Sequence, residues 1–540
     1  MEKQTKEKAK YGMSRRGFLS TGAAIGAFTL VPNHVVSAAK HGRVAPSDKI
    51  RMVHIGCGTE GLSELGALLT CPQIEIVGVA DPNRASYDYI YWSPTGLRDK
   101  LRHMLKDPNW MGSQKGTPGG REIMKEVVER YYTSFRPGWK GDIACMEDYR
   151  EMLDKIKDVD AVKIMSPDHL HAYQAIDCLK RGKHIIMHKP LGNKMDEAMK
   201  VVDMAKNSSL STHMMAWNAF GDGNMELIKN WIDAGAIGEL EEIHNWTNRP
   251  VWPQYPDIPT DTPPIPKDFN WDLWLGPAQM RPYHPHYTHC TFRGWYEFGA
   301  GSMADMGYYS LWSVFDALQL GSATSASSRF SRVVKLRDNV PYTQINDHSY
   351  PMASACHWNI PYKSGKGSIQ LQWHDGGMKP GVPEGYKVAA AINTENIPSG
   401  DSRYAANQNA NDLPLQGMMF KGTKGAIVSG FNREEPRLFA PDSAKYADIQ
   451  GSPMKEQPGD KMADGTERWL QMWIDGCRGK GKGRGSFEFA KEVNETFNLG
   501  SVSLMSQGKE VIYDPKSRQI TNDAEANKLL KRDIRKGWEM

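Results

Sequence analysis

A glycine-rich turn between two apolar segments constrains the fold of this chain more than any other feature. Residues 49–55 form an apolar run, and a Gly-x-Gly-x-x-Gly pattern begins at Gly56 and opens a stretch with helix-compatible leucine spacing. A second apolar run, residues 74–80, ends at Asp81, which lies 20 residues after Gly61. The glycines permit a tight turn and a close approach of the backbone to a pyrophosphate at a helix N-terminus. This order of strand, loop, helix, strand and acid predicts a dinucleotide-binding unit.

The acidic residue at the end of the second run distinguishes two dinucleotides. A carboxylate at this position holds the adenosine ribose hydroxyls, so Asp81 favours NAD. Arg84 lies close enough in sequence to accept a 2′-phosphate, and NADP is the less favoured alternative. The loop residues expected to contact the cofactor are Gly56, Gly58, Thr59, Glu60 and Gly61.

A second segment is predicted to deliver a lysine to the same sheet. Residues 182–187 form an apolar strand signal directly before His188-Lys189-Pro190. Pro190 fixes its own φ and restricts the residue before it, which holds the Lys189 ammonium in place. At the carboxyl edge of a nucleotide-binding sheet, such a lysine lies where chemistry beside a nicotinamide needs an acid or a base.

The first 39 residues are typical of an export signal. Four lysines precede Ser14-Arg15-Arg16-Gly17-Phe18-Leu19, which is followed by a Gly/Ala-rich apolar stretch and Ser37-Ala38-Ala39. Paired arginines before a mildly apolar segment resemble a twin-arginine signal, which moves folded proteins across a bacterial inner membrane. We therefore expect a periplasmic protein. A retained anchor is the alternative, although the apolar stretch is short and Gly-rich for a stable span.

The charge of the remaining chain gives no indication of nucleic-acid binding. The whole sequence has 67 basic and 63 acidic residues, and residues 40–540 hold 61 of each. A neutral chain without a basic patch lacks the electrostatic footprint of a nucleic-acid partner. The seven cysteines have no paired spacing, and folding precedes export, so we expect no disulfide framework.

The strand and helix signals divide the chain into two domains. Residues 48–215 alternate between the two, which predicts a Rossmann domain with a parallel sheet and right-handed crossovers. In residues 216–540, later strand signals predict a second, antiparallel sheet. These signals lie at residues 353–360, 367–374 and 417–420.

Three segments fall outside this regular pattern. Residues 86–141 interrupt the first domain. We favour a surface excursion for this segment, and the alternative is a flap over an active-site mouth or an oligomer contact. Residues 249–299 are rich in proline and aromatic side chains and are expected to line a pocket or to cover a sheet. Residues 398–413 are expected to form a polar loop.

Several motifs together resemble the Gfo/Idh/MocA oxidoreductases. They are the glycine loop, Ser166-Pro167-Asp168-His169-Leu170-His171, the His188-Lys189-Pro190 turn and Gly299-Ala300-Gly301-Ser302-Met303-Ala304-Asp305-Met306-Gly307. Residues 269–277 and 520–527 resemble the exported bacterial branch of that family. The resemblance covers residues 48–540. It implies a Rossmann domain plus an α/β domain on an open, mostly antiparallel sheet, with NAD(P) between the domains and sugars, cyclitols or their glycosides as substrates. The further cofactor contacts that it implies are Ser166, Pro167, Asp168, His171, His188 and Lys189.

Two positions depart from the family pattern. The family turn is usually Glu-Lys-Pro, and His188 replaces the glutamate here, while Lys189 matches the lysine that contacts substrate and nicotinamide ribose. The family also has an aspartate followed four residues later by a proton-exchanging histidine. Asp305 matches the aspartate, and Tyr309 stands in place of the histidine. A phenol with a reference pKa of ~10 is a poor base at neutral pH, so either Lys189 with a lowered pKa or a nearby histidine is the candidate base.

Histidines elsewhere in the second domain are candidates for that role. They are His284, His286, His289 and, after a later strand, His374. The first three lie close to Cys290, which also suggests a metal site. However, Pro282 and Pro285 disrupt the ligand spacing and no set of carboxylates accompanies them, so we expect a sugar-contacting loop and no metal.

The combined pattern predicts an exported NAD-dependent oxidoreductase that acts on a sugar, cyclitol or glycoside, with Lys189 and Asp305 handling a hydroxyl proton. Free NAD is not expected outside the inner membrane, so the cofactor should be held tightly and regenerated in place. One alternative is a glycoside-cleaving enzyme that oxidises a hydroxyl transiently, eliminates a substituent and returns the hydride. Another is an NAD- and sugar-binding protein without turnover. We also expect a homo-oligomer formed through the C-terminal sheet.

Overall fold

The computed structural model describes residues 48–217, 223–386, 412–452 and 461–539. The predicted signal, residues 1–39, lies outside these ranges, as does all but the end of the predicted polar loop 398–413. The elements from Ile50 onward belong to one folded unit. Within the described residues, no helix is both long and apolar enough to cross a membrane.

The first domain is built on a parallel sheet that has six strands among the described residues. Their order is β3-β2-β1-β4-β5-β6, and each neighbouring pair is parallel. The strands are β1 (Ile50–Ile55), β2 (Ile74–Ala80), β3 (Ala144–Met146), β4 (Ala161–Ile164), β5 (His184–Met187) and β6 (Thr212–Met214). The order reverses direction between β1 and β4, where α/β sheets of this type bind ligands beyond the carboxyl ends of the strands. The predicted Rossmann class is confirmed.

The leucine run after the glycine loop forms two short helices, whereas the sequence favoured one. They are α3 (Thr59–Ser63) and α4 (Gly66–Thr70). The buried Lys163 ammonium donates to the Glu64 carbonyl at 2.9 Å, an oxygen that a continuous helix would pair with the amide of Leu68. The Leu68 amide bonds to the Leu65 carbonyl instead. The helix therefore breaks at a contact that no local pattern encodes.

The other helices of the first domain lie on both faces of its sheet. They are α5 (Gly96–Leu105), α6 (Arg121–Phe135), α7 (Tyr149–Lys155), α8 (Asp168–Lys180) and α9 (Met195–Lys206). Helix α5 and most of α6 lie within the 86–141 segment. Leu97, Leu101 and Leu105 of α5 recur at four-residue spacing and are buried in the core of the first domain. Much of the segment is therefore part of this domain rather than a surface excursion.

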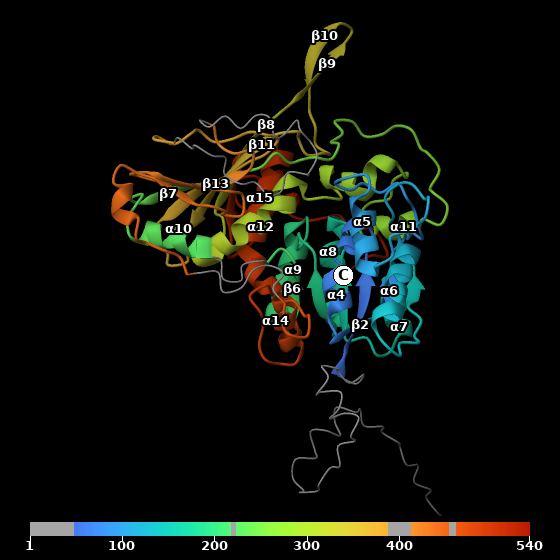
Figure 1. Cartoon of the computed structure of the whole chain (residues 1–540). Helices are drawn as coiled ribbons and strands as arrows, with labels where there is room; N and C mark the ends of the chain where they lie inside the picture. The colour runs from blue at the N-terminus through green and yellow to red at the C-terminus, as the bar shows by residue number, and fades with distance from the viewer. Residues whose placement is uncertain (1–47, 218–222, 387–411, 453–460, 540) are drawn as a thin grey trace, which may run out of the picture. The chain divides into compact units, whose positions relative to one another are not determined.

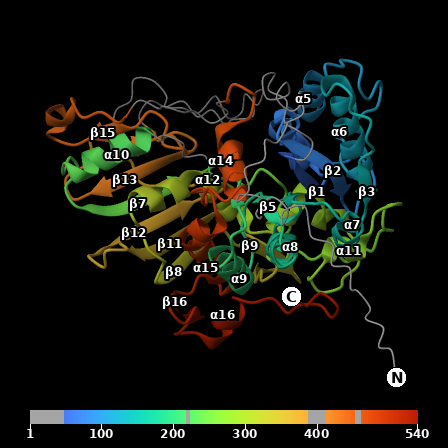
Figure 2. The ribbon, with the colours of Figure 1, turned by 90° about the horizontal axis from the view of Figure 1, so that it is seen from below.

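The second domain is built on a mixed sheet that has nine strands over the described ranges. Its order is β15-β14-β13-β7-β12-β11-β8-β16-β17, and β7 and β12 are its parallel pair. The strands are β7 (Leu240–Trp246), β8 (Ser325–Phe330), β11 (Ser354–Pro361), β12 (Ser368–His374), β13 (Gly417–Gly422), β14 (Ala426–Ser429), β15 (Arg437–Phe439), β16 (Val511–Asp514) and β17 (Gln519–Ile520). Figure 2 shows β13, β7, β12, β11 and β8 side by side. The predicted open, mostly antiparallel sheet is confirmed.

Helices pack against one face of this sheet and supply part of the site. They are α10 (Gly223–Asp233), α12 (Gly301–Ala317), α15 (Lys491–Met505) and, at the β17 edge, α16 (Ala524–Lys528). Helix α11 (Trp271–Leu275) lies beside the first domain instead, where the Asn270 amide donates to the Pro82 carbonyl at 3.0 Å. Helix α12 is buried along nearly its whole length, and a hydrogen bond of 2.6 Å from Ser310 to Asn245 ties it to β7. Beyond β8, the hairpin of β9 (Val333–Arg337) and β10 (Val340–Gln344) extends away from the sheet (Figure 1).

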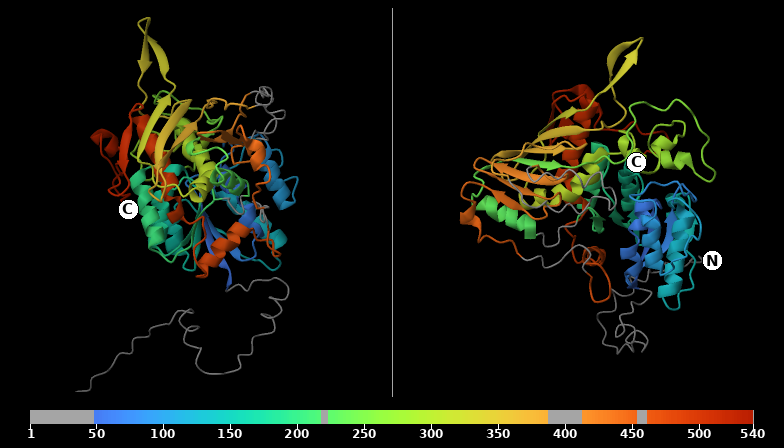
Figure 3. Two further views of the ribbon diagram at one scale, coloured as in Figure 1. Left: turned by 90° about the vertical axis from the view of Figure 1, so that its left-hand side faces the viewer. Right: turned by 45° about the horizontal axis from the view of Figure 1, so that its top comes forward.

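A late segment of the chain returns to the first domain. Helix α14 (Arg468–Cys477) places Leu470, Trp473 and Ile474 in the core formed by β1, β2 and their helices. The Trp473 indole donates to the Ile185 carbonyl of β5 at 3.0 Å. Figure 3 shows this orange helix beside the blue and green elements of the first domain. The first domain is therefore completed by residues that the sequence assigns to the second.

Candidate active site

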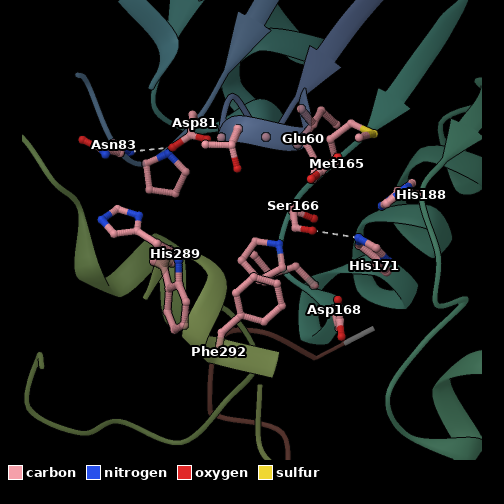
Figure 4. Close-up of a pocket in the computed structure, with 18 of the residues that line it drawn as sticks. Glu60, Asp81, Asn83, Met165, Ser166, Asp168, His171, His188, His289 and Phe292 are labelled. Atoms are coloured by element: carbon pink, nitrogen blue, oxygen red, sulfur yellow. Dashed lines mark hydrogen bonds between the residues drawn. The ribbon is translucent and has the colours of Figure 1, made fainter. Parts of the chain in front are cut away.

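One cavity lies at the carboxyl ends of the first sheet and is lined by both domains (Figure 4). From the first domain, its lining includes the predicted residues Gly56, Gly58, Thr59, Glu60, Asp81, Ser166, Pro167, Asp168, His171, His188 and Lys189. The second domain contributes Phe269, Leu273, Trp274, His289, Cys290, Phe292 and Arg293. The proline- and aromatic-rich segment 249–299 thus lines a pocket, which was one of its two predicted roles.

The glycine loop has the geometry that a dinucleotide requires. Gly56 has a φ of +89°, and a Cβ at this position would lie 2.5 Å from the Met165 carbonyl carbon. A Cβ on Gly61 would lie 2.5 Å from the Gly56 carbonyl oxygen, so Gly61 is buried beneath the loop rather than exposed in the cavity. No larger residue fits either position without displacing backbone. The two glycines therefore permit the tight turn and the close strand–helix packing of a dinucleotide-binding loop.

Asp81 lies beside this loop at the end of β2. One carboxylate oxygen accepts a hydrogen bond from the Cys57 amide at 2.6 Å, and the other accepts from the Asn83 amide at 2.7 Å. Each oxygen keeps a second lone pair for a ribose hydroxyl. Burial raises the pKa of Asp81, and the two amides oppose that rise. The glycine loop and Asp81 together fit the adenosine half of NAD.

Lys189 and Asp305 meet in the interior of the site. Lys189 follows β5, Asp305 lies in the second turn of α12, and the ammonium donates to the carboxylate. The Arg293 guanidinium donates to the same carboxylate oxygen at 3.2 Å. Burial alone would raise the pKa of Asp305, but the charges of Lys189 and Arg293 hold it well below its usual value. Asp305 is therefore an ionised anchor for two cations.

The two residues that depart from the family pattern contact each other. His188 Nε2 lies 2.9 Å from the Tyr309 hydroxyl oxygen. Tyr309 is one helical turn after Asp305 on α12, and the Lys189 ammonium lies 5.5 Å from the centre of its ring. Burial raises the pKa of Tyr309 and lowers that of His188, so both groups are neutral near pH 7. The histidine expected near Tyr309 is thus His188, which the sequence suggested only as a cofactor contact.

Residues that follow β4 hold the Lys189 turn in place through hydrogen bonds. His171 of α8 lies within hydrogen-bonding distance of two carbonyl oxygens, that of Ser166 at 2.8 Å and that of Pro190 at 2.7 Å (Figure 4). Asp168 accepts from the Ala300 amide at 3.0 Å, and burial raises the pKa of its carboxyl to about 6. These contacts join the first domain to the start of α12 and fix Lys189 opposite Asp305.

Other predicted residues lie away from the reacting groups. Arg84 does not line the cavity, and its guanidinium pairs with Asp268 at 3.3 Å. His289 packs against Tyr89 near Asp81, at the opposite end of the cavity from His188 (Figure 4). His286 stacks on Tyr255, with ring centres 3.7 Å apart. The other two, His284 and His374, are likewise outside the cavity lining.

Sequence reasoning missed several residues of the site. Arg293 was not singled out, although it lies in the segment expected to line a pocket. Residues 89–92 of the 86–141 segment also line the cavity, which supports the flap interpretation for that part. Across the described ranges, no group of three or more histidine, cysteine or acidic side chains is arranged to hold a metal ion.

The two domains, the glycine loop and the lysine–aspartate pair define a two-domain protein with a dinucleotide-binding first domain. The sequence model described as "Oxidoreductase family, NAD-binding Rossmann fold" matches residues 136–215. The model described as "Oxidoreductase family, C-terminal alpha/beta domain" matches residues 240–324. Models of the Gfo/Idh/MocA oxidoreductase family thus match part of each domain, in agreement with the resemblance of the motifs.

Individual relatives match parts of the chain. A levoglucosan dehydrogenase from Pseudarthrobacter phenanthrenivorans is 38% identical over 93 residues, which are 17% of this chain and 23% of that protein. An alpha-N-acetylgalactosaminidase from Shewanella oneidensis is 23% identical over 244 residues, which are 43% of this chain and 45% of that protein. The chain thus spans less than half the length of these curated relatives.

Solved structures align over most of the chain at low identity. Levoglucosan dehydrogenase, in complex with NADH and L-sorbose, aligns with a TM-score of 0.46 and 16% identity, over 86% of this chain and 99% of that one. The WlbA dehydrogenase from Bordetella pertussis, in complex with NADH and UDP-GlcNAcA, aligns with a TM-score of 0.46 and 11% identity, over 86% and 99%.

Proposed function

We propose that the protein is an NAD-dependent oxidoreductase acting on a sugar, cyclitol or glycoside. The observation that carries the proposal is the placement of the Lys189–Asp305 pair in the same cavity as the glycine loop and Asp81. When bound there, NAD supplies the hydride acceptor for a ring C–H. The catalytic residues of this chain are Lys189, Asp305 and Tyr309.

Lys189 positions the substrate hydroxyl and stabilises negative charge on its oxygen. Its ammonium has three hydrogens, of which one is donated to Asp305, so others are free to bond a hydroxyl oxygen. Asp305 is ionised and shared with Arg293, and it keeps the ammonium charged and oriented. A positioned cation of this kind favours an alkoxide over a hydroxyl.

The Tyr309–His188 pair supplies the proton acceptor that the family's histidine would otherwise provide. Tyr309 is a weak base alone, because burial disfavours its phenolate. His188 is neutral and bonded to the phenol at 2.9 Å, so it accepts the phenolic proton as Tyr309 receives one from the substrate. Because burial lowers the pKa of His188, the imidazole relays this proton rather than retaining it, and no free phenolate forms.

A second candidate is glycoside cleavage by transient oxidation and elimination, without net redox change. The observation that favours it is the match to the Shewanella oneidensis alpha-N-acetylgalactosaminidase and to Shewanella proteins named glycosyl hydrolase family 109. The same groups serve both reactions, because each begins by removing a hydroxyl proton. NAD- and sugar-binding without turnover is the third possibility.

A glycoside panel separates these reactions. The NAD-loaded protein is incubated with chromogenic glycosides, and the NADH absorbance and the released aglycone are read together. NADH formation with an intact glycoside supports the dehydrogenase, and aglycone release without net NADH supports the elimination cycle. The absence of both signals across a broad panel would contradict both enzymatic proposals and support the binding protein.

We propose a periplasmic location, reached by the twin-arginine route. The support is Arg15-Arg16 before the apolar stretch in residues 1–39. Residues 1–39 fused to a folded fluorescent protein should direct it to the periplasm, and replacing both arginines with lysine should retain it in the cytoplasm. If neither fusion gives periplasmic fluorescence, the proposal is contradicted.

We also propose a homo-oligomer formed through the face of the second sheet that lies opposite α12. Asn245 of β7 faces α12, so its neighbours His244 and Trp246 point to the opposite face, where Glu242 pairs with Lys421 at 2.9 Å. Sedimentation should give a mass above that of one chain. Introducing Glu242→Arg should shift the distribution toward monomer, and a monomeric native protein would contradict the proposal.

A further inference from the structure

Arg249 lies at the end of β7, and its backbone is held in place. The Arg249 carbonyl accepts a hydrogen bond from the Gly376 amide at 2.6 Å, and its amide donates to the Thr247 hydroxyl oxygen at 3.3 Å. Thr247 in turn donates to Gln416 at 2.6 Å. The direction of this side chain is therefore fixed by the sheet rather than by a loose loop.

The Arg249 guanidinium is buried without a hydrogen-bond partner. The residue is 8% exposed, and Nε and Nη1 have no partner among the described residues. A guanidinium removed from water normally gains charge-assisted hydrogen bonds in exchange. Hydrogen bonds from the described residues do not offset this burial at Nε and Nη1.

This guanidinium lies beside the cavity, although Arg249 is not part of its lining. It lies over the ring of Trp92, with 4.7 Å from the guanidinium carbon to the ring centre, and Trp92 lines the cavity. The charged groups that act on it most strongly are Asp305 and Arg293. Arg249 therefore belongs to the cluster of charges around Lys189.

The cluster around Asp305 leaves one cation without a bonded carboxylate. Lys189 and Arg293 share Asp305, and the carboxyls of Glu60 and Asp168 lie close to these two cations. Nε and Nη1 of Arg249 bond to no described residue. The Arg249 guanidinium therefore has donors left for an anion.

We propose that the substrate is an acidic sugar whose anionic oxygens, from a carboxylate or an ester sulfate or phosphate, bond to the Arg249 guanidinium. This inference rests on the proposed function, because it assigns a substrate class to the same site. The anion offsets the burial of the guanidinium and orients the sugar ring against Lys189. A neutral sugar lacks the charge that this subsite requires.

The test compares matched sugars on the NAD-loaded full chain by calorimetry. The pairs are 4-nitrophenyl glucuronide with the glucoside and galacturonide with the galactoside, since each pair differs at one carbon. Glucose 6-sulfate and glucose 6-phosphate identify which anion binds. The acidic member should bind at least about thirtyfold more tightly, a preference typical of a buried charge pair, and Arg249→Met should abolish it.

The controls separate this inference from the proposed function. Arg478→Met, at an exposed position of the surface, should leave the preference intact. Arg249→Lys keeps the charge and should retain part of the preference. This variant keeps the test decisive if Arg249→Met does not fold. Three results would overturn the inference. They are equal affinity for acidic and neutral sugars, no binding of any of these sugars, and a preference that is unchanged in Arg249→Met. An Arg249-dependent preference without NADH formation or aglycone release supports the anion subsite and contradicts the enzymatic function instead.

Discussion

Two buried arginines of this protein differ in what surrounds them. Arg532, near the C-terminus, donates to Glu197 of α9 at 2.9 Å, to Glu297 at 3.0 Å and to Asn193 at 2.6 Å. Arg249 is buried to the same extent, but its Nε and Nη1 bond to no described residue. One guanidinium is thus fully engaged within the protein, and the other is placed beside the cavity without a partner.

The difference distinguishes a charge that maintains the fold from a charge that serves a ligand. Removing one member of a buried pair leaves the other unpaired in a medium of low polarity, so the partners of Arg532 depend on it. An unpartnered charge adds nothing to stability, and its retention points to a ligand. Substitutions in the two regions should therefore affect different quantities.

The largest effect is expected in the cavity. Lys189→Ala should lower kcat by about 10²–10⁴, because it removes the group that positions and stabilises the reacting oxygen. NAD content and thermal stability should stay near native values, since Asp305 keeps its bond to Arg293. Steady-state kinetics with parallel nucleotide analysis makes this measurement. A near-native kcat would show that Lys189 has no catalytic role.

The opposite response is expected at the C-terminal cluster. Arg532→Met should lower the free energy of unfolding by about 3–5 kcal/mol, because Glu197 and Glu297 are left without their cation. The kcat of the folded fraction should change little. Urea unfolding measures the loss, with Arg478→Met as the exposed control. A loss below about 1 kcal/mol would contradict the claim that Arg532 maintains the fold.

An intermediate effect on activity alone is expected at Tyr309. Tyr309→Phe removes the hydroxyl bonded to His188 and should lower kcat by about a hundredfold, the low end of an acid–base contribution. Tyr309→His restores the family's residue and should recover part of the loss. If Tyr309→Phe is as active as the native protein, the phenol only fills space, and Lys189 becomes the candidate base.

The smallest effect is expected for the stability of an Arg249 variant. Arg249→Met removes a buried charge without a partner, so the free energy of unfolding should change by less than about 1 kcal/mol, or rise. Urea unfolding of the sugar-free protein beside Arg532→Met tests this contrast directly. A loss as large as that of Arg532→Met would show that Arg249 is structural.

The features that the sequence predicted well are those encoded locally. The glycine loop, Asp81 and the Lys189 turn each depend on a few neighbouring residues, and strand periodicity then located some strands of each sheet. The features that it missed depend on distant contacts. The break between α3 and α4 comes from Lys163, about a hundred residues later in the chain, and α14 joins a core that was assigned to another domain.

The same reasoning explains the gaps in the predicted site. Arg293 and Arg249 stand in irregular segments, where no periodicity indicates the direction of a side chain. His188 and Tyr309 are 121 positions apart, and their contact exists only because β5 and α12 end at one cavity. The sequence showed that each departs from the family pattern, and the structure shows that the two departures form one pair.

The most direct test of the account is the cofactor of the purified full chain. The protein is denatured after extensive dialysis, and the released nucleotide is analysed by mass spectrometry. The complete glycine loop with Asp81 predicts stoichiometric NAD or NADH, and so does the proposed export, after which a cofactor would have to be retained. Release of no nucleotide, together with no NAD binding by calorimetry, would contradict the account.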